Sequence, residues 1–452
     1  MISDTIAAIS TGVAGSSAIS IIRVSGDESI EVVNKIFRGA DLSTQESHTI
    51  HYGRIKCPET SVIIDEVLIM LMRGPRSFTT EDVVEINCHG GAFVTKRILE
   101  LLLTYGARHA HAGEFSKRAF LNGRIDLSEA EAIMDIIDAK SNHALELAVG
   151  SLDGKVKKLI IELRESILDI VAHIEVNIDY PEYDDVEEMT NDILLPKSNA
   201  VYQKMEHLLR TAKTGQLLKN GIKTAIIGRP NVGKSSLLNQ LMREEKAIVT
   251  DIAGTTRDTV EGFVNIGGLT LNLIDTAGIR KTDNIIESIG VEKSKNLIEE
   301  AELILLVLDS SEVLTNEDKE LLELTKNKNR IILLNKSDLN QKLNTINLSS
   351  YIPTSMIKPS GITQLEKEIK SIFNINDIKS DETFISNTRH IAKLNQSIIA
   401  VESAITQMQI GMPIDMVEID LKNSWELLGE IIGEKAPEEL INELFTKFCL
   451  GK

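Results

Sequence analysis

The chain has 452 residues, and at roughly 150 residues per domain this length suggests about three domains. Apolar residues make up 42% and charged residues 26%, the composition of an ordinary globular protein with sizeable cores. The formal net charge of −18 excludes nucleic-acid binding through global charge, so such binding would need a local basic patch or a second protein.

The cysteine count and the apolar runs indicate the compartment. Cys57, Cys88 and Cys449 are too far apart in sequence for a disulfide framework or a zinc-binding motif. Cysteines this sparse fit a reducing environment. No apolar run reaches the ~20 residues of a membrane span, and the first residues lack the regions of a signal peptide. We therefore expect a cytoplasmic protein with no membrane partner.

The N-terminal segment mixes strand-like and helical runs. Strands are expected at 18–24, 66–72 and 82–87, separated by turn residues. The apolar spacing between 93 and 105 is helical. This pattern predicts a compact α+β domain, which we place at residues 1–118.

Helical periodicity then dominates residues 119–216. Ser128 is a candidate N-cap, with Glu131 completing a capping box. The acidic segment 181–188 is interpreted as a solvated loop, with a cation site as the alternative. A long amphipathic helix is predicted from apolar residues at steps of three and four, namely Ile160, Leu163, Ile167, Ile170 and Ile174.

Strand-like and helical runs alternate between residues 217 and 375. Strands are expected at 224–227, 271–274, 303–308, 330–334 and 351–353. Their continuous apolar character favours a parallel sheet covered on both faces. Helical spacing returns at 376–452. We therefore expect this α/β domain to be inserted into one helical domain made of residues 119–216 and 376–452.

Residues 228–235 match the pattern G-x-x-x-x-G-K-[ST] between a strand and a helix start, which predicts a P-loop. Backbone N–H groups and the helix N-terminus would bind phosphates there. Lys234 would reach the β- and γ-phosphates, and Ser235 would ligate Mg²⁺. The predicted GTP contacts in this loop are Asn231, Val232, Gly233, Lys234, Ser235 and Ser236.

Three further motifs follow later strands, at the edge where α/β sheets bind ligands. Residues 275–278 supply a carboxylate on the Mg²⁺ side and a glycine that senses the γ-phosphate. Residues 335–338 end in an aspartate that accepts the N1–H and 2-amino hydrogens of guanine, and the loop after the last strand can meet guanine O6. The predicted contacts are Asp275, Thr276, Ala277, Gly278, Asn335, Lys336, Asp338 and Ser355.

Hydrolysis needs a threonine in the Mg²⁺ shell and a group that acts on water. In the loop 250–258 we expect Thr256 to complete the shell, with Thr255 as the alternative. Ile279 stands where Ras-like GTPases carry a water-positioning glutamine, so another device is required. Asn231 can help hold a monovalent cation beside the phosphates, and Glu287 is a candidate for orienting water.

Together with residues 113–124 and the ending 448–452, these motifs resemble the tRNA-modification GTPases called MnmE or TrmE over the whole chain. The resemblance implies an N-terminal domain that binds a tetrahydrofolate derivative (5-formyl or 5,10-methylene) and forms a homodimer, followed by a helical domain with an inserted Ras-like G domain. It also implies an FAD-binding partner, MnmG or GidA, in a heterotetramer. The complex would add a carboxymethylaminomethyl or aminomethyl group to C5 of the wobble uridine of certain tRNAs, using a folate one-carbon unit.

The resemblance assigns folate contacts to Arg23, Glu85, Arg124 and Lys452. The three cations suit the glutamate carboxylates of folate, and Glu85 suits the pterin N–H groups. Cys449 lies in the terminal signature, where Leu450 replaces the family's Ile. A nucleophilic and a supporting role both stay open for its thiol, and we favour the supporting role.

For the G domain the resemblance implies potassium in place of an arginine finger. The potassium ligands would be Asn231, Thr250, Ile252 through its backbone oxygen, and Thr255. Thr256 then joins Ser235 on Mg²⁺, and Glu287 becomes the catalytic residue, assisted by Lys234 and Thr256. The nucleotide contacts of this loop would be Thr250, Asp251, Ile252, Ala253, Gly254, Thr255 and Thr256.

Two alternative functions are a regulatory GTPase switch and, more weakly, a degenerate scaffold that has lost catalysis. The intact P-loop, Asp275 and Glu287 speak against the scaffold. A regulatory GTPase switch in ribosome assembly or signalling would share the G-domain motifs but lack the folate residues. A Cys88–His89 catalytic pair is disfavoured, because neighbours on a strand point to opposite faces. The net charge of −18 further predicts that the FAD-binding partner carries much of the tRNA-binding surface.

Overall fold

The structure is a computed structural model that describes residues 4–12, 17–179, 189–244, 262–274, 296–343, 348, 350–355, 357, 360–373, 375 and 383–451. The acidic segment 181–188, the loops 250–258 and 275–279, Glu287 and Lys452 lie outside the described residues. Contacts group the chain into two compact units, Met1–Met134 with Gly429–Lys452 and Asp135–Leu428. The domain boundaries at 118, 216 and 375 remain predictions. Among the described helices, none is long and apolar enough to cross a membrane.

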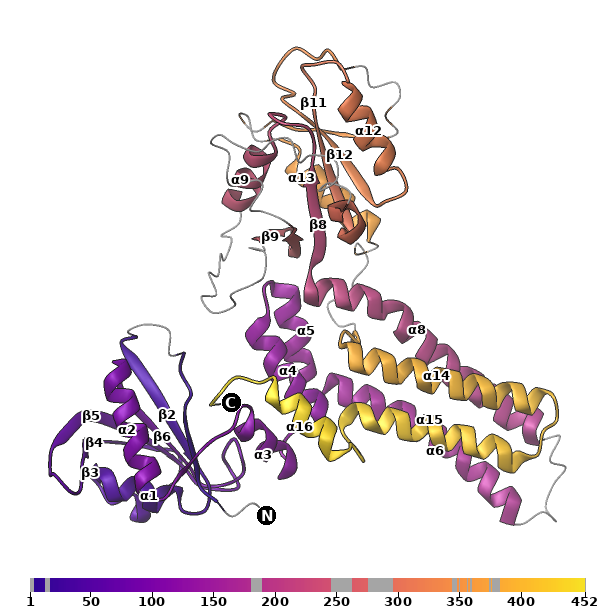
Figure 1. Cartoon of the computed structure of the whole chain (residues 1–452). Helices are drawn as coiled ribbons and strands as arrows, with labels where there is room; N and C mark the ends of the chain where they lie inside the picture. The colour runs from indigo at the N-terminus through magenta and orange to yellow at the C-terminus, as the bar shows by residue number, and fades with distance from the viewer. Residues whose placement is uncertain are drawn as a thin grey trace. The chain divides into compact units, whose positions relative to one another are not determined.

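The first unit is built on a seven-stranded sheet in the order β3-β4-β5-β6-β2-β1-β7 (Figure 1). The predicted strands are confirmed as β2 (Ile19–Ser25), β5 (Ile63–Met72) and β6 (Val83–His89). The sheet also contains β1 (Ile6–Ile9), β3 (Phe37–Arg38), β4 (Thr49–Lys56) and β7 (Arg108–His109).

Helices α1 (Ser29–Ile36) and α2 (Ala92–Thr104) pack on one face of this sheet. Alternate residues such as Ile22, Ile69 and Ile86 point to that face and are buried there. The unit also contains α3 (Glu114–Leu121) and α16 (Glu438–Thr446), which contact each other through Phe120 and Phe445. The α2 helix confirms the helix predicted between 93 and 105.

The N-terminus of α4 (Leu127–Asp138) corrects one sequence expectation. Ser128 lies inside the helix and is not its N-cap. The Asp126 carboxylate accepts the Glu129 N–H at 2.8 Å, and the Glu129 carboxylate accepts the Asp126 N–H at 2.8 Å. Asp126 is therefore the N-cap of α4. Its carboxylate and the Glu129 carboxylate each accept the other residue's backbone N–H, which completes a capping box.

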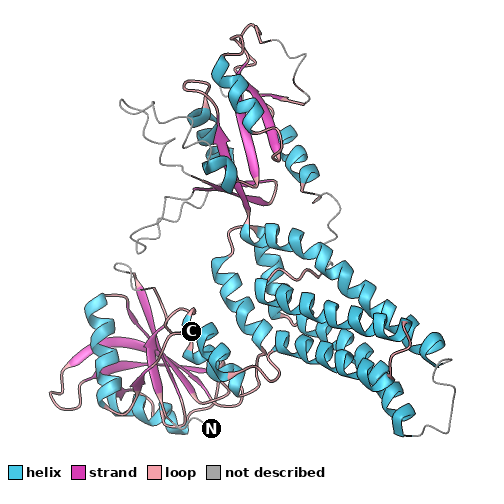
Figure 2. Ribbon diagram, turned by 45° about the vertical axis from the view of Figure 1, so that its right-hand side comes forward, coloured by secondary structure: helices cyan, strands magenta, loops and turns pink. Residues whose placement is uncertain are grey.

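The helical part of the second unit contains α5 (Asn142–Leu152), α6 (Lys155–Asp179), α8 (Leu195–Asn220), α14 (Thr388–Gln409) and α15 (Ile414–Ile432) (Figure 2). A π-helical turn, Thr190–Leu194, precedes α8. The predicted apolar stripe of α6 is confirmed, since all five of its residues are buried. In the same core, the guanidinium carbon of Arg164 lies 3.9 Å from the Trp425 ring centre.

The inserted part is a six-stranded sheet in the order β13-β12-β11-β8-β10-β9. Its strands are β8 (Ile222–Ile227), β9 (Gly262–Ile266), β10 (Leu269–Leu273), β11 (Leu303–Asp309), β12 (Arg330–Asn335) and β13 (Ile352–Pro353). Its described helices are α9 (Lys234–Glu244), α12 (Asn316–Leu324) and α13 (Ile362–Ile372). The predicted parallel sheet is thus confirmed for five strands and corrected at one edge, where β9 pairs antiparallel with β10.

Candidate functional site

The loop between β8 and α9 has the backbone shape that phosphate binding needs. Gly228 and Gly233 have φ values of +155° and +101°. A Cβ on Gly228 would lie 2.4 Å from the Val307 carbonyl oxygen, and one on Gly233 would lie 2.1 Å from Asn335 Nδ2. Only glycine fits at both positions. The Lys234 ammonium donates to the carbonyls of Gly228 and Arg229 at 2.8 and 2.9 Å, so its charge lies over this loop.

The predicted guanine motif joins the phosphate loop directly. The Asn335 side chain donates from Nδ2 to the Val232 carbonyl at 2.7 Å, and both residues are buried. The Asp338 carboxylate accepts the Ser355 hydroxyl at 2.6 Å. The structure therefore brings the loops after β8, β12 and β13 together at one edge of the sheet, as ligand sites of α/β proteins require.

Lys336 of this motif is anchored by a residue that the sequence reasoning missed. Its ammonium lies 2.6 Å from Asp309 Oδ2, at the end of β11. Burial alone would raise the pKa of Asp309, but the bonds from Lys336 and Ser311 hold that pKa below its usual value. An aspartate that closes an otherwise apolar strand was the available signal, since a buried charge requires a partner.

Arg229 in the phosphate loop was also missed. Its guanidinium pairs with Glu312 and lies 3.4 Å from Asp318. Asp318 in turn forms the capping box of α12 with Thr315. Arg229 therefore ties the phosphate loop to the start of α12.

A second cluster of predicted residues lies in the first unit. Arg23 on β2 and Glu85 on β6 are direct cross-strand partners. The Arg23 Nε and Nη2 atoms both lie 2.8 Å from Glu85 Oε1. The two side chains are 20% and 13% exposed, so this pair is stronger than a fully solvated one.

The segment 448–451 packs into the same cluster. The Gly451 carbonyl accepts the Ser10 hydroxyl at 3.1 Å and Arg23 Nη1 at 3.4 Å. The Cys449 carbonyl accepts the Gly113 N–H at 3.4 Å, and the Cys449 side chain is exposed. Residues from both ends of the described chain thus meet at the Arg23–Glu85 pair.

Arg124 reaches this cluster through an aromatic ring that the sequence reasoning missed. The guanidinium carbons of Arg23 and Arg124 lie 5.5 and 5.2 Å from the Phe78 ring centre. Among the described residues Arg124 has no ion pair, and its side chain is exposed. Its hydrogen-bond donors are therefore available to an anion.

The Cys88–His89 interpretation is settled by the two side-chain environments. Cys88 is buried with its Sγ 3.4 Å from the Ser20 carbonyl, and burial raises the pKa of its thiol. His89 is exposed and pairs with Asp65 at 2.6 Å. The two side chains point to opposite faces of β6, as predicted, and form no catalytic pair.

Fold and site together define the class, a P-loop GTPase whose G domain is accompanied by a helical domain and an N-terminal α+β domain. The MnmE helical domain family matches residues 127–449, and the family described as GTP-binding protein TrmE N-terminus matches residues 5–124. The chain belongs to the MnmE family of tRNA modification GTPases, and its enzymatic activity is the hydrolysis of GTP.

Individual relatives support this assignment. A tRNA modification GTPase MnmE of Streptococcus agalactiae serotype Ia is 54% identical over 452 residues, covering 99% of this chain and 98% of the relative. One of Bacillus cytotoxicus is 53% identical over 456 residues, covering 99% of each chain. A crystal structure of Aquifex aeolicus Era bound to GDP·AlF4⁻ has a TM-score of 0.25 at 28% identity, over 40% of this chain and 66% of that one.

Proposed function

We propose that this enzyme is a potassium-activated GTPase that, with an FAD-dependent partner, adds a carboxymethylaminomethyl or aminomethyl group to C5 of the wobble uridine of certain tRNAs. The one-carbon unit comes from a bound tetrahydrofolate derivative. The observation that carries the proposal is the cluster of Arg23, Glu85, Arg124 and the 448–451 segment. A GTPase switch without folate chemistry has no use for that cluster.

The chemistry of this cluster fits a folate. Arg23 binds Oε1 of Glu85, and Oε2 makes no recorded hydrogen bond within the described part of the chain. A carboxylate with one open oxygen suits the adjacent N–H groups of a pterin. Arg124 supplies an open guanidinium for a glutamate carboxylate of the folate, and we propose that Lys452 supplies another. Arg23 then serves mainly to orient Glu85, a narrower role than the carboxylate binding expected from the sequence.

The nucleotide roles are proposed residue by residue. Lys234 neutralises the β- and γ-phosphates, Asp338 reads guanine, and Ser235 with Thr256 ligates Mg²⁺, since hydroxyl oxygens are hard ligands of that ion. Asn231 has φ of +60° and is exposed, and its side-chain oxygen has no recorded partner among the described residues. That oxygen is available to potassium, together with Thr250, Ile252 and Thr255. The charge of a potassium ion beside the phosphates would stabilise the transition state, and Glu287 would act on the water.

A homodimer is proposed on the basis of the outward face of β4 and β5. Ile50, Tyr52 and Leu68 are 63%, 64% and 46% exposed, on the face opposite α1 and α2. Contiguous exposed apolar side chains of this kind mark protein interfaces. The acidic net charge supports a division of labour in which the FAD-binding partner carries much of the surface that contacts tRNA.

Two measurements test the proposal. Isothermal titration of the full chain with 5-formyltetrahydrofolate should show one site per chain, and the absence of heat at high concentration would refute the folate function. GTP turnover should be faster in KCl than in NaCl at equal ionic strength. Equal rates would refute potassium activation and leave the folate result standing.

A further inference from the structure

Phe78 contacts two arginines of the proposed folate site, Arg23 and Arg124. Its half-buried ring lies 5.5 Å from the Arg23 guanidinium carbon and 5.2 Å from that of Arg124. We propose that Phe78 is a positioning residue that holds the Arg124 guanidinium beside the Arg23–Glu85 pair, ready for an anionic group of the ligand. This inference rests on the folate function proposed above.

The two arginines depend on the ring to different degrees. Arg23 has three further anchors, namely Glu85, the Gly451 carbonyl and the Phe115 ring at 5.6 Å. Arg124 is exposed, and in the described part of the chain its guanidinium has the Phe78 ring as a cation–π partner and no ion pair. A long, solvated arginine loses rotamer freedom when it binds a ligand. The cation–π contact with Phe78 already restricts the Arg124 side chain before the ligand binds, so less rotamer freedom is lost on binding.

The loop that carries Phe78 is fixed on both sides of the ring. The Ser77 hydroxyl donates to the Glu81 carbonyl at 2.6 Å. Thr79 is fully buried and shares a hydrogen bond with Ser25 at 2.7 Å. Asn122 donates from Nδ2 to the Thr79 carbonyl at 2.7 Å, which ties the loop to the segment that leads to Arg124. Because the residues on both sides of Phe78 are hydrogen-bonded, the backbone that carries the ring has a fixed position.

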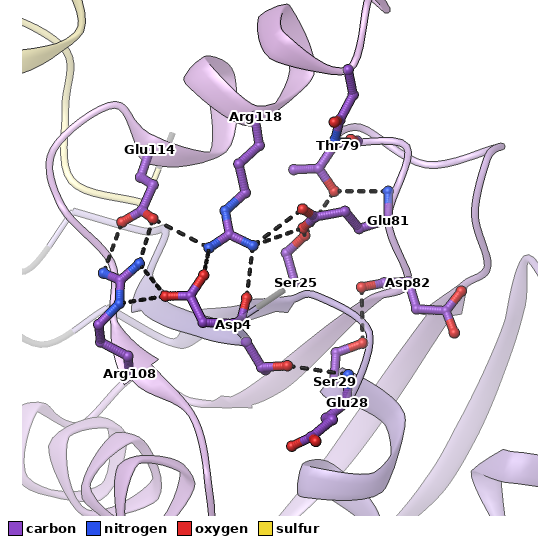
Figure 3. Close-up of polar contacts among 12 residues, drawn as sticks. Asp4, Ser25, Glu28, Ser29, Thr79, Glu81, Asp82, Arg108, Glu114 and Arg118 are labelled. Atoms are coloured by element: carbon purple, nitrogen blue, oxygen red, sulfur yellow. Dashed lines mark hydrogen bonds and ion pairs between the residues drawn. The ribbon is translucent and has the colours of Figure 1, made fainter. Parts of the chain in front are cut away.

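An ion network around the buried Arg118 holds this loop through Glu81 (Figure 3). Arg118 is 1% exposed, and its Nη1 lies 3.1 Å from each carboxylate oxygen of Glu81. Its Nη2 lies 2.7 Å from Asp4 and 3.2 Å from Glu114. The Glu81 carboxylate also accepts the Ser25 hydroxyl at 2.7 Å. The buried Arg118 guanidinium and the Ser25 hydroxyl thus hold the Glu81 carboxylate, three residues after Phe78 in the same loop.

The test compares substitutions that keep or remove the ring. In full-length protein, Phe78→Leu keeps an apolar side chain, and Phe78→Tyr keeps the ring face. Titration with 5-formyltetrahydrofolate should show affinity about 2- to 5-fold weaker for Phe78→Leu, the equivalent of roughly 0.5–1 kcal/mol for an exposed cation–π contact. The affinity of Phe78→Tyr should equal that of the wild type, because this variant keeps the ring. Phe93→Leu is the matched control, because this phenylalanine is 82% exposed and lies over no cation of the described residues.

A double-mutant cycle separates positioning from a general structural role. In the Arg124→Ala background, Phe78→Leu should cause no further loss of affinity, because its effect acts through Arg124. Additive losses, failure of Phe78→Tyr to restore binding, or an equal loss in Phe93→Leu would each overturn the proposal.

A ligand-free measurement keeps this proposal distinct from the folate function. In the NMR spectrum, the Arg124 side-chain protons should show a ring-current shift that Phe78→Leu removes and Phe78→Tyr retains. If the wild-type protein fails to bind 5-formyltetrahydrofolate, the folate function is refuted. The ring-current shift then decides whether Phe78 positions Arg124, and its absence in the wild type would refute that as well.

Discussion

Replacing Gly451 with alanine should release the 448–451 segment from β1 and weaken folate binding. Gly451 has φ of +87°, and a Cβ there would lie 2.4 Å from the Ile9 carbonyl oxygen and 2.7 Å from Ser10 Cα. Both atoms belong to backbone at the end of β1, so neither can yield as a flexible side chain would. The segment itself must move.

The size of the effect follows from what the movement loses. A left-handed conformation costs a residue with a Cβ about 1–2 kcal/mol. Moving the segment away also removes the hydrogen bonds from Ser10 and Arg23 to the Gly451 carbonyl, each contributing roughly 0.5–1.5 kcal/mol. The lower ends of these ranges add to about 2 kcal/mol, which corresponds to at least a roughly 30-fold rise in Kd, if the ligand binds only when the segment is docked.

Isothermal titration with 5-formyltetrahydrofolate measures this change. Gly411→Ala is the matched control, because Gly411 has φ of +71° and no atom of the described residues lies within 4 Å of the added Cβ. It therefore introduces the backbone strain without the clash. Thermal unfolding of both variants checks that the fold is intact. An affinity for Gly451→Ala within 2-fold of the wild type would refute the reasoning about the docked segment.

Three further predictions concern the nucleotide site and acid stability. Asp338→Asn should shift preference from GTP toward xanthosine triphosphate, and unchanged discrimination in competition assays would refute its role in reading guanine. Glu287→Ala should nearly abolish turnover while GTP affinity is kept, and surviving turnover would exclude it as the group that acts on water. Burial alone would raise the pKa of Glu114, but Arg108 and the His111 N–H hold that pKa below its usual 4.5. Because the folded-state pKa is lowered, this carboxylate stabilises the fold above about pH 4.5 and the contribution is lost as the pH falls further. Below about pH 4.5, the melting temperature of the wild type should therefore fall more steeply with decreasing pH than that of Glu114→Gln. Equal slopes of melting temperature against pH would contradict this.

The phosphate loop was predictable because its motif encodes a backbone shape. Gly228 and Gly233 must approach other backbone or side-chain atoms closely, and this requirement is visible as two glycines at fixed spacing. The Gly267-Gly268 pair carries a similar signal in the sequence. Its φ values of +55° and +85° suit a two-residue hairpin turn, which is why β9 pairs antiparallel with β10.

Other features could not be predicted because they depend on contacts between distant segments. Arg118, Asp4 and Glu81 are ordinary charged residues in the sequence, and only the fold buries Arg118 and brings the two carboxylates to its guanidinium. The same holds for Phe78, because its ring contacts Arg23 and Arg124, which are far from it along the chain. The predicted N-cap of α4 was wrong for a local reason. Asp126 and Ser128 both match the sequence pattern of a capping box, and the hydrogen bonds of Glu129 show that Asp126 is the cap.

The contact between Ser10 and Gly451 joins residues 441 positions apart, and this separation has a consequence for biosynthesis. At about 5–20 residues per second, a ribosome needs roughly 20–90 seconds to pass from one to the other. The strands of the first unit emerge early, yet Arg23 meets the Gly451 carbonyl only after the intervening 400-odd residues have been translated. A chain interrupted within the G domain can already hold nucleotide motifs but lacks this part of the proposed folate site. Occupancy of that site would therefore report that translation had proceeded through Gly451.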